Sequence, residues 1–65
     1  MVEIARIMTF GTANRRDIVR RLMGCSRFFK GLTFADAIAT YRYYERNGLV
    51  VHGDGWLAIY HDCEN

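Results

Sequence analysis

Proline is absent from the 65 residues, and only two cysteines and one tryptophan occur. Without proline, the breaks between elements depend on glycine and on capping residues. The cysteines, Cys25 and Cys63, are too few for the disulfide framework of a small secreted scaffold. We therefore expect free thiols, with one long-range disulfide as the alternative.

Long apolar runs are also missing. No stretch approaches the roughly 20 residues that span a bilayer. Glu3 and Arg6 interrupt the N-terminal apolar residues, so the chain does not begin like a signal peptide. These absences predict no membrane partner and a cytoplasmic location, in the host cell if the chain is viral.

What is present indicates one folded domain over residues 1–65. The composition is 51% hydrophobic against 25% charged, which is not the composition of a disordered chain. A chain of this length buries only a modest share of its surface, so we expect slim stability.

The net charge of +2 hides a strong asymmetry along the chain. Residues 6–30 carry seven cations and one acid, a local charge of +6, whereas residues 31–65 carry two cations and five acids. Eight of the nine cations are arginine, whose planar guanidinium binds phosphate in a fork. Segregated positive charge indicates a polyanionic partner, and the alternative interpretation is a solvated basic helix.

Spacing and capping residues predict three helices. Ile4, Ile7 and Met8 recur at helical spacing and predict a helix over about 2–10 that ends at Gly11. A second helix, over about 14–23, begins at the capping residue Asn14. The third, over about 33–47, has the clearest start signal, with Thr33 as cap and Asp36 three residues on.

A hairpin is predicted over about 49–61. The segments "LVVH" and "WLAIYH" are rich in β-branched and aromatic residues, and "GDG" between them supplies a tight turn. Because a two-stranded ribbon is barely stable alone, we expect it to lie on the helices.

This pattern resembles the winged helix-turn-helix domain of small prokaryotic and viral DNA-binding regulators of the MarR and ArsR kind. The segments that carry the likeness are "RRDIVRRL", "TFADAIATYRYYERNGLVV" and "HGDGW". The resemblance implies an α+β fold, a three-helix winged helix-turn-helix with a C-terminal two-stranded β-hairpin wing.

In that family the third helix enters the major groove of DNA. The resemblance implies that the groove-facing residues are Ala35, Ala39, Arg42, Tyr43 and Arg46. Small alanine side chains allow close approach, and Arg42 could bind guanine through two bonds or hold a phosphate. The residues implied to contact the DNA backbone are Arg15, Arg16, Arg20, Arg27 and Lys30.

The wing would present His52, Asp54 and Trp56, and it departs from the family pattern because its tip carries an acid and no cation. This acid favours an alternative function, a winged-helix interaction module that binds a host protein such as a polymerase or a defence complex. Trp56 next to the turn is more typical of a hairpin staple than of a ligand contact.

Catalysis and metal binding are not predicted. His52, His61, Cys25 and Cys63 lack the spacing of a zinc site. No paired carboxylates, Gly-rich phosphate loop or activated nucleophile is recognisable, so we expect neither an enzyme nor a cofactor.

We therefore expect a double-stranded DNA-binding protein, acting as a small transcriptional regulator or recombination accessory factor of phage, archaeal-virus or mobile-element origin. A homodimer is expected, because symmetric half-sites multiply the few base contacts of one small domain. The first helix, the wing and the C-terminal tail are the candidate dimer surfaces.

Overall fold

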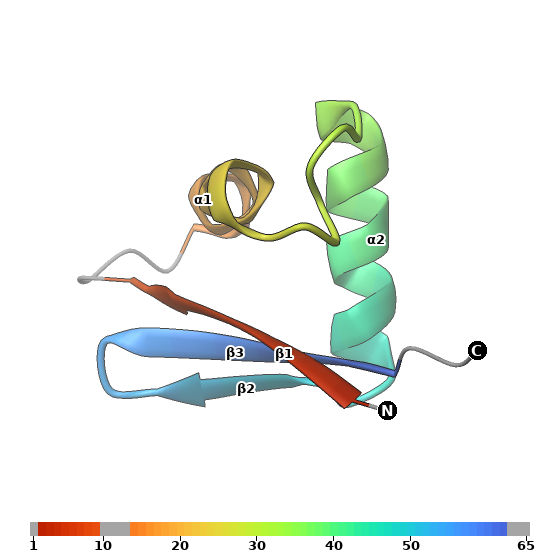
Figure 1. The fold of residues 1–65 in the computed structure, drawn as a ribbon. Coiled ribbons are helices and arrows are strands. Elements are labelled where there is room, and N and C mark those ends of the chain that lie inside the picture. Colours follow the sequence, from red (N-terminus) through yellow and green to blue (C-terminus); the bar gives the residue numbers. More distant parts are fainter. Residues whose placement is uncertain (1, 10–13, 63–65) are drawn as a thin grey trace.

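A computed structural model describes residues 2–9 and 14–62, which form two helices and one sheet (Figure 1). In chain order the elements are β1 (Val2–Met8), α1 (Arg15–Cys25), α2 (Phe34–Arg46), β2 (Val50–Gly53) and β3 (Trp56–Asp62). The strands form an antiparallel sheet in the order β1-β3-β2. Both helices lie on the same face of this sheet, so the fold has two layers (Figure 1).

The first element is a strand, and the helix predicted over 2–10 is wrong. Ile7 is buried, whereas Val2, Ile4 and Met8 are exposed on the other face of the strand. Because both faces carry apolar residues, the alternation that marks a strand is hidden, and pairing with β3 decides the conformation. Gly11, the predicted helix end, lies outside the described residues.

The fold as a whole corrects the expectation of a three-helix winged helix-turn-helix. It is a small α+β arrangement of two helices and a three-stranded antiparallel sheet within the described ranges. The C-terminal hairpin is not a separate wing, because β3 is the central strand. It pairs with β1 from Val2↔Asp62 to Met8↔Trp56, and with β2 from Val50↔Ile59 to Gly53↔Trp56.

The capping residues account for where the helices begin. The Asn14 side chain accepts a hydrogen bond from the Arg16 amide at 2.8 Å, and the Thr33 hydroxyl accepts one from the Asp36 amide at 3.1 Å. Each bond satisfies an amide that has no partner within its helix. α2 ends before Gly48, whose φ of 69° is the left-handed conformation that favours glycine.

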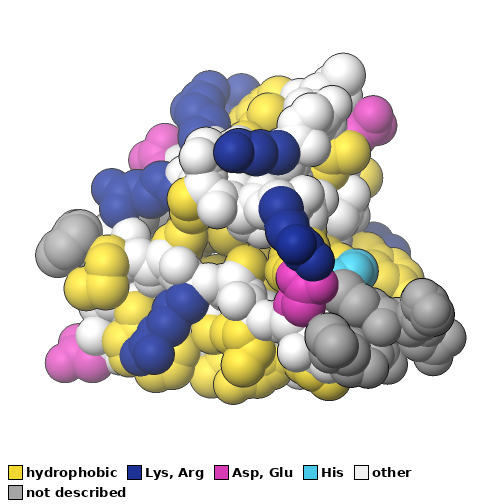
Figure 2. All heavy atoms as spheres, viewed as in Figure 1, with side chains coloured by type: hydrophobic (Ala, Val, Ile, Leu, Met, Phe, Trp, Pro, Cys, Tyr) yellow, Lys and Arg dark blue, Asp and Glu magenta, His cyan; other side chains and the backbone are white. Residues whose placement is uncertain are grey.

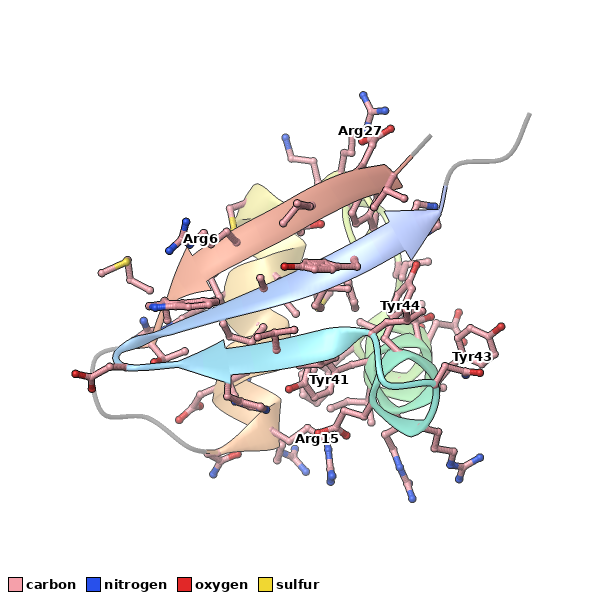
Figure 3. The ribbon with its side chains drawn as sticks, turned by 90° about the horizontal axis from the view of Figure 1, so that it is seen from below. Arg6, Arg15, Arg27, Tyr41, Tyr43 and Tyr44 are labelled. Carbon is pink, nitrogen blue, oxygen red and sulfur yellow. The ribbon has the colours of Figure 1, made fainter. Side chains whose placement is uncertain are left out.

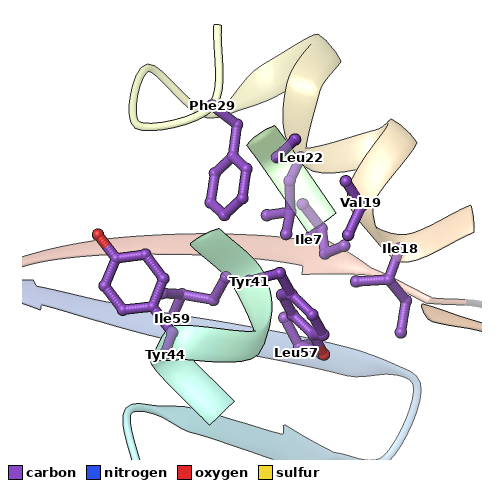
Figure 4. Close-up of a cluster of buried hydrophobic side chains, with 10 residues drawn as sticks. Ile7, Ile18, Val19, Leu22, Phe29, Tyr41, Tyr44, Leu57 and Ile59 are labelled. Atoms are coloured by element: carbon purple, nitrogen blue, oxygen red, sulfur yellow. The ribbon is translucent and has the colours of Figure 1, made fainter. Parts of the chain in front are cut away.

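The core lies between the helices and the inner face of the sheet (Figure 4). It is formed by Ile7, Ile18, Val19, Leu22, Phe29, Ala37, Tyr41, Tyr44, Leu57 and Ile59. Phe29 comes from the turn between the helices and is fully buried, so this turn is anchored to the core. Burying a side chain of this size contributes about 1.5–3 kcal/mol. Of the described helices, neither is long and apolar enough to cross a membrane.

Candidate nucleic-acid interface

The solvent side of α2 carries all five residues that the winged-helix resemblance assigns to the major groove of DNA. All five residues are exposed to solvent, and Tyr43 is 62% exposed. Four of them recur at intervals of four, three and four residues and therefore share one face of the helix. We call this row the α2 stripe, and its members are Ala35, Ala39, Arg42 and Arg46. Tyr43 stands next to the stripe.

A second row of α2 side chains faces α1. Its members each precede a stripe residue by one position, which turns them by about 100° around the helix axis. They are Phe34, Ile38, Tyr41 and Glu45. Side chains of α1 that touch this row are therefore neighbours of the stripe.

At the N-terminal end of α2, two arginines of α1 lie against one aromatic ring. The guanidinium carbons of Arg16 and Arg20 are 5.3 and 4.9 Å from the centroid of the Phe34 ring. These distances are within the range of a cation–π contact. The ring thus positions both cations beside the start of the stripe, and Arg20 also lies 3.5 Å from Asp17.

At the other end of α2, Arg15 forms an ion pair with Glu45, with 3.2 Å between Nε and Oε1. Figure 3 shows Arg15 beside Tyr41. Burial, and then the negative charge of Glu45, raise the pKa of Tyr41 to about 12, whereas Arg15 acts in the opposite direction. The α1 arginines therefore flank the stripe at both ends.

We call the combined surface the arginine face, formed by Arg15, Arg16, Arg20, Arg42 and Arg46. Two of its cations have acidic neighbours, but these pairs are exposed to solvent and contribute little to stability. Within the described part of the chain, Arg16, Arg42 and Arg46 form no ion pair. Most of the positive charge of this face is thus available to an anionic partner.

The remaining cations lie elsewhere, so the positive charge that the sequence concentrates in residues 6–30 is divided between different sides of the molecule. Arg27 forms an ion pair with Glu3 of β1, and Arg6 lies over the Trp56 ring at 4.5 Å. Figure 3 shows Arg6 and Arg27 on the β1 side of the molecule, opposite Arg15, and the face seen in Figure 2 has its cations in separate spots. Lys30 belongs to the same compact turn as Arg27.

The hairpin tip is shaped by packing. His52 and Asp54 are exposed, and Trp56 is half-buried. A Cβ atom on Gly53 would lie 1.9 Å from the indole ring, so only glycine leaves room for the ring at this position. Trp56 thus packs across the hairpin and holds Arg6, in agreement with its interpretation as a staple.

Two residues of the interface were not singled out by the sequence. Phe34 and Glu45 are not among the candidates from the sequence, yet Phe34 positions Arg16 and Arg20, and Glu45 positions Arg15. Thirty residues separate Arg15 from Glu45, and no local spacing signals a contact of that range.

The histidines do not form a metal cluster with the described acids and Cys25. His61 instead contacts the Tyr44 hydroxyl through its Nδ1 atom and packs on Phe28, with 4.3 Å between the ring centroids. Cys25 is a free, exposed thiol, and Cys63 lies outside the described residues.

Comparisons of the chain with protein-family models, with curated proteins and with solved structures found no match. The function of the chain must therefore be inferred from its own residues and geometry.

Proposed function

We propose that this protein binds double-stranded DNA through the arginine face, with the exposed side of α2 in the major groove. The observation that carries the proposal is the position of the α2 stripe, which has two stripe arginines of its own and three α1 arginines at its flanks. Arginines on an exposed helix and beside it can hold the phosphates that border a groove.

The dimensions of α2 suit this role. Its 13 residues give a rod of about 20 Å, and an α-helix with its side chains is about 10–12 Å wide, close to the roughly 12 Å of the major groove. Ala35 and Ala39 let the backbone of α2 approach the bases, and either could contact a thymine methyl group.

The arginines have two different roles in this proposal, base recognition and phosphate binding. Arg42 lies in the middle of the exposed row, where its fork can bind the two acceptors of a guanine. Arg15, Arg16 and Arg20 hold phosphates and so fix the orientation of the helix. A small protein of this kind would act as a transcriptional regulator or as a recombination accessory factor.

The test compares two double variants that remove the same charge. Arg42→Ala with Arg46→Ala removes two cations from the stripe, whereas Arg6→Ala with Arg27→Ala removes two cations from the β1 side. Fluorescence anisotropy with a labelled random duplex should show at least about tenfold weaker binding for the stripe variant, because each lost contact costs about 1 kcal/mol or more.

The β1-side variant should bind within about threefold of the wild type, since only long-range attraction changes. Equal losses in the two variants would show that total charge, and not the α2 surface, determines binding. Unchanged binding in the stripe variant would exclude α2 from the interface.

A further inference from the structure

β1 is an edge strand, and its backbone groups can be assigned to its two sides. The Thr9 amide donates to the Gly55 carbonyl at 2.8 Å, on the β3 side, and the register between the strands is unbroken. Backbone groups alternate in direction along a strand, so Glu3, Ala5 and Ile7 bond to β3. The amides and carbonyls of the intervening residues point to the open edge; these residues are Val2, Ile4 and Arg6.

Two other bonds support this assignment. The Tyr60 amide donates to the Leu49 carbonyl at 2.9 Å, so the even-numbered residues of β3 bond to β2 and leave the odd-numbered ones for β1. The Met8 carbonyl, which should also point outward, accepts a bond from Arg21 Nη1 at 2.7 Å. The open edge therefore runs from Val2 to Arg6 and is closed at Met8.

This edge has few of the devices that usually prevent strand pairing. Edge strands are commonly protected by proline, by charges or by short length. β1 has seven residues, and on its outer face Val2, Ile4 and Met8 are 59%, 59% and 52% exposed. Arg6 is the one charged residue of that face of β1. A stripe of exposed apolar side chains thus borders unpaired backbone groups.

On the helix side of the edge lies a groove of about 460 Å³. Its walls are residues 3–6 of β1 and residues 25–28, which run from the last residue of α1 into the following turn. Arg27, bonded to Glu3, contributes a cation to this groove. The groove can therefore accept small side chains and a carboxylate from a strand added to β1.

We propose that the strand added to β1 is β1 of a second copy, paired antiparallel about a two-fold axis at Ile4. This register pairs the three residues whose amide and carbonyl both point to the open edge. Ile4 faces Ile4 of the other copy, and Val2 of each copy faces Arg6 of the other. Each of these pairs exchanges two main-chain hydrogen bonds. A two-fold contact is isologous, so the same patch serves both copies.

Side-chain chemistry on both faces agrees with this register. On the outer face, the apolar side chains of Ile4 meet at the axis. On the helix side, Glu3 of one copy faces the small Ala5 of the other, so the Glu3–Arg27 ion pair of each copy lies next to the groove of its partner. Both helix pairs then lie on one side of a continuous six-stranded sheet.

The dimer needs none of the residues of the arginine face, so it does not depend on DNA binding. Pairing of one seven-residue strand buries less than the roughly 800 Å² per partner of a standard interface. The association is accordingly weak, reversible and dependent on protein concentration.

Sedimentation velocity over a range of protein concentrations, without DNA, tests the proposal. The wild type should pass from monomer to dimer, and Ile4→Pro should stay monomeric, because proline removes an amide that points to the open edge and not to β3. His52→Pro is the matched control. The alternation in β2 directs the His52 amide to the opposite edge of the sheet, so this variant should still dimerise.

A second variant serves if Ile4→Pro does not fold. Ile4→Lys keeps the amide and substitutes a side chain that is already 59% exposed, but it places two like charges at the two-fold axis. It should weaken the dimer about tenfold or more. A wild type that is monomeric throughout, or a folded Ile4→Lys protein that associates like the wild type, would overturn the proposal.

Discussion

Tyr41 is a residue whose acidity is altered by the fold. Only 1% of it is exposed, and its pKa is raised from 10.0 to about 12, first by burial and then by Glu45. Between these values the unfolded chain loses the phenolic proton while the folded chain keeps it. The stabilising contribution of the neutral phenol is therefore complete below pH 10 and is lost as the pH rises towards 12.

We expect the free energy of unfolding to fall by about 1.4 kcal/mol per pH unit over this interval. Tyr41→Phe should remove this dependence, because it keeps the buried ring and deletes the ionisable group. Urea unfolding at several alkaline pH values measures the slope. Tyr43→Phe, which alters a tyrosine that is 62% exposed, is the control and should retain the wild-type slope. If Tyr41→Phe showed the wild-type slope, the loss of stability at alkaline pH would not come from ionisation of Tyr41.

Among the elements, α1 contains a glycine, the residue with the lowest helix propensity after proline. Gly24 lies in its last turn, and a Cβ atom there would meet nothing within 4 Å. Gly24→Ala should therefore raise the free energy of unfolding by about 0.5–1 kcal/mol, because alanine loses less backbone freedom on folding.

Gly48→Ala provides the contrast for this prediction. Its Cβ would also meet nothing, but its φ of 69° strains any residue with a side chain, so this variant should be less stable than the wild type. Urea denaturation midpoints of the two variants should shift in opposite directions. A shift in the same direction would show that backbone conformation does not control the stability effect at one of the two sites.

The elements also show how far the sequence predicts the fold. The two helices and the hairpin could be located because caps at Asn14 and Thr33 and the turn around Asp54 are local signals. β1 could not, because the residues it pairs with in β3 lie 48 to 60 positions away in the chain. The apolar residues on its solvent face imitate a helical pattern, and this is the same feature that makes its edge suitable for pairing.

At the scale of the whole molecule, the cations fall into two groups, on the arginine face and on the β1 side. The exposure of the α2 residues could be predicted, because it follows from helical spacing. The separation of Arg27 from Arg15 could not, because it depends on how α1 and the following turn pack on the sheet. The charge pattern therefore indicated a basic protein but not the extent of its basic surface.

A prediction about salt follows from this division. If Arg15, Arg16, Arg20 and Arg46 contact about four phosphates while Arg42 binds a base, the logarithm of the DNA association constant should fall with the logarithm of the salt concentration at a slope of roughly −4. Arg42→Ala with Arg46→Ala should reduce the magnitude of this slope by about 1, because Arg46 is the phosphate contact of the two. Titrations of the duplex at several salt concentrations measure this slope. Duplex binding that does not depend on salt would show that the affinity does not come from phosphate contacts.

Phe34 gives the arginine face a property that charge alone does not provide. Its ring holds Arg16 through an uncharged surface, so the guanidinium is positioned without being neutralised. A freely moving arginine loses up to about 2 kcal/mol of rotamer entropy when an anion immobilises it. Here part of that entropy is already lost when the monomer folds, and an arriving phosphate meets a pre-organised cation.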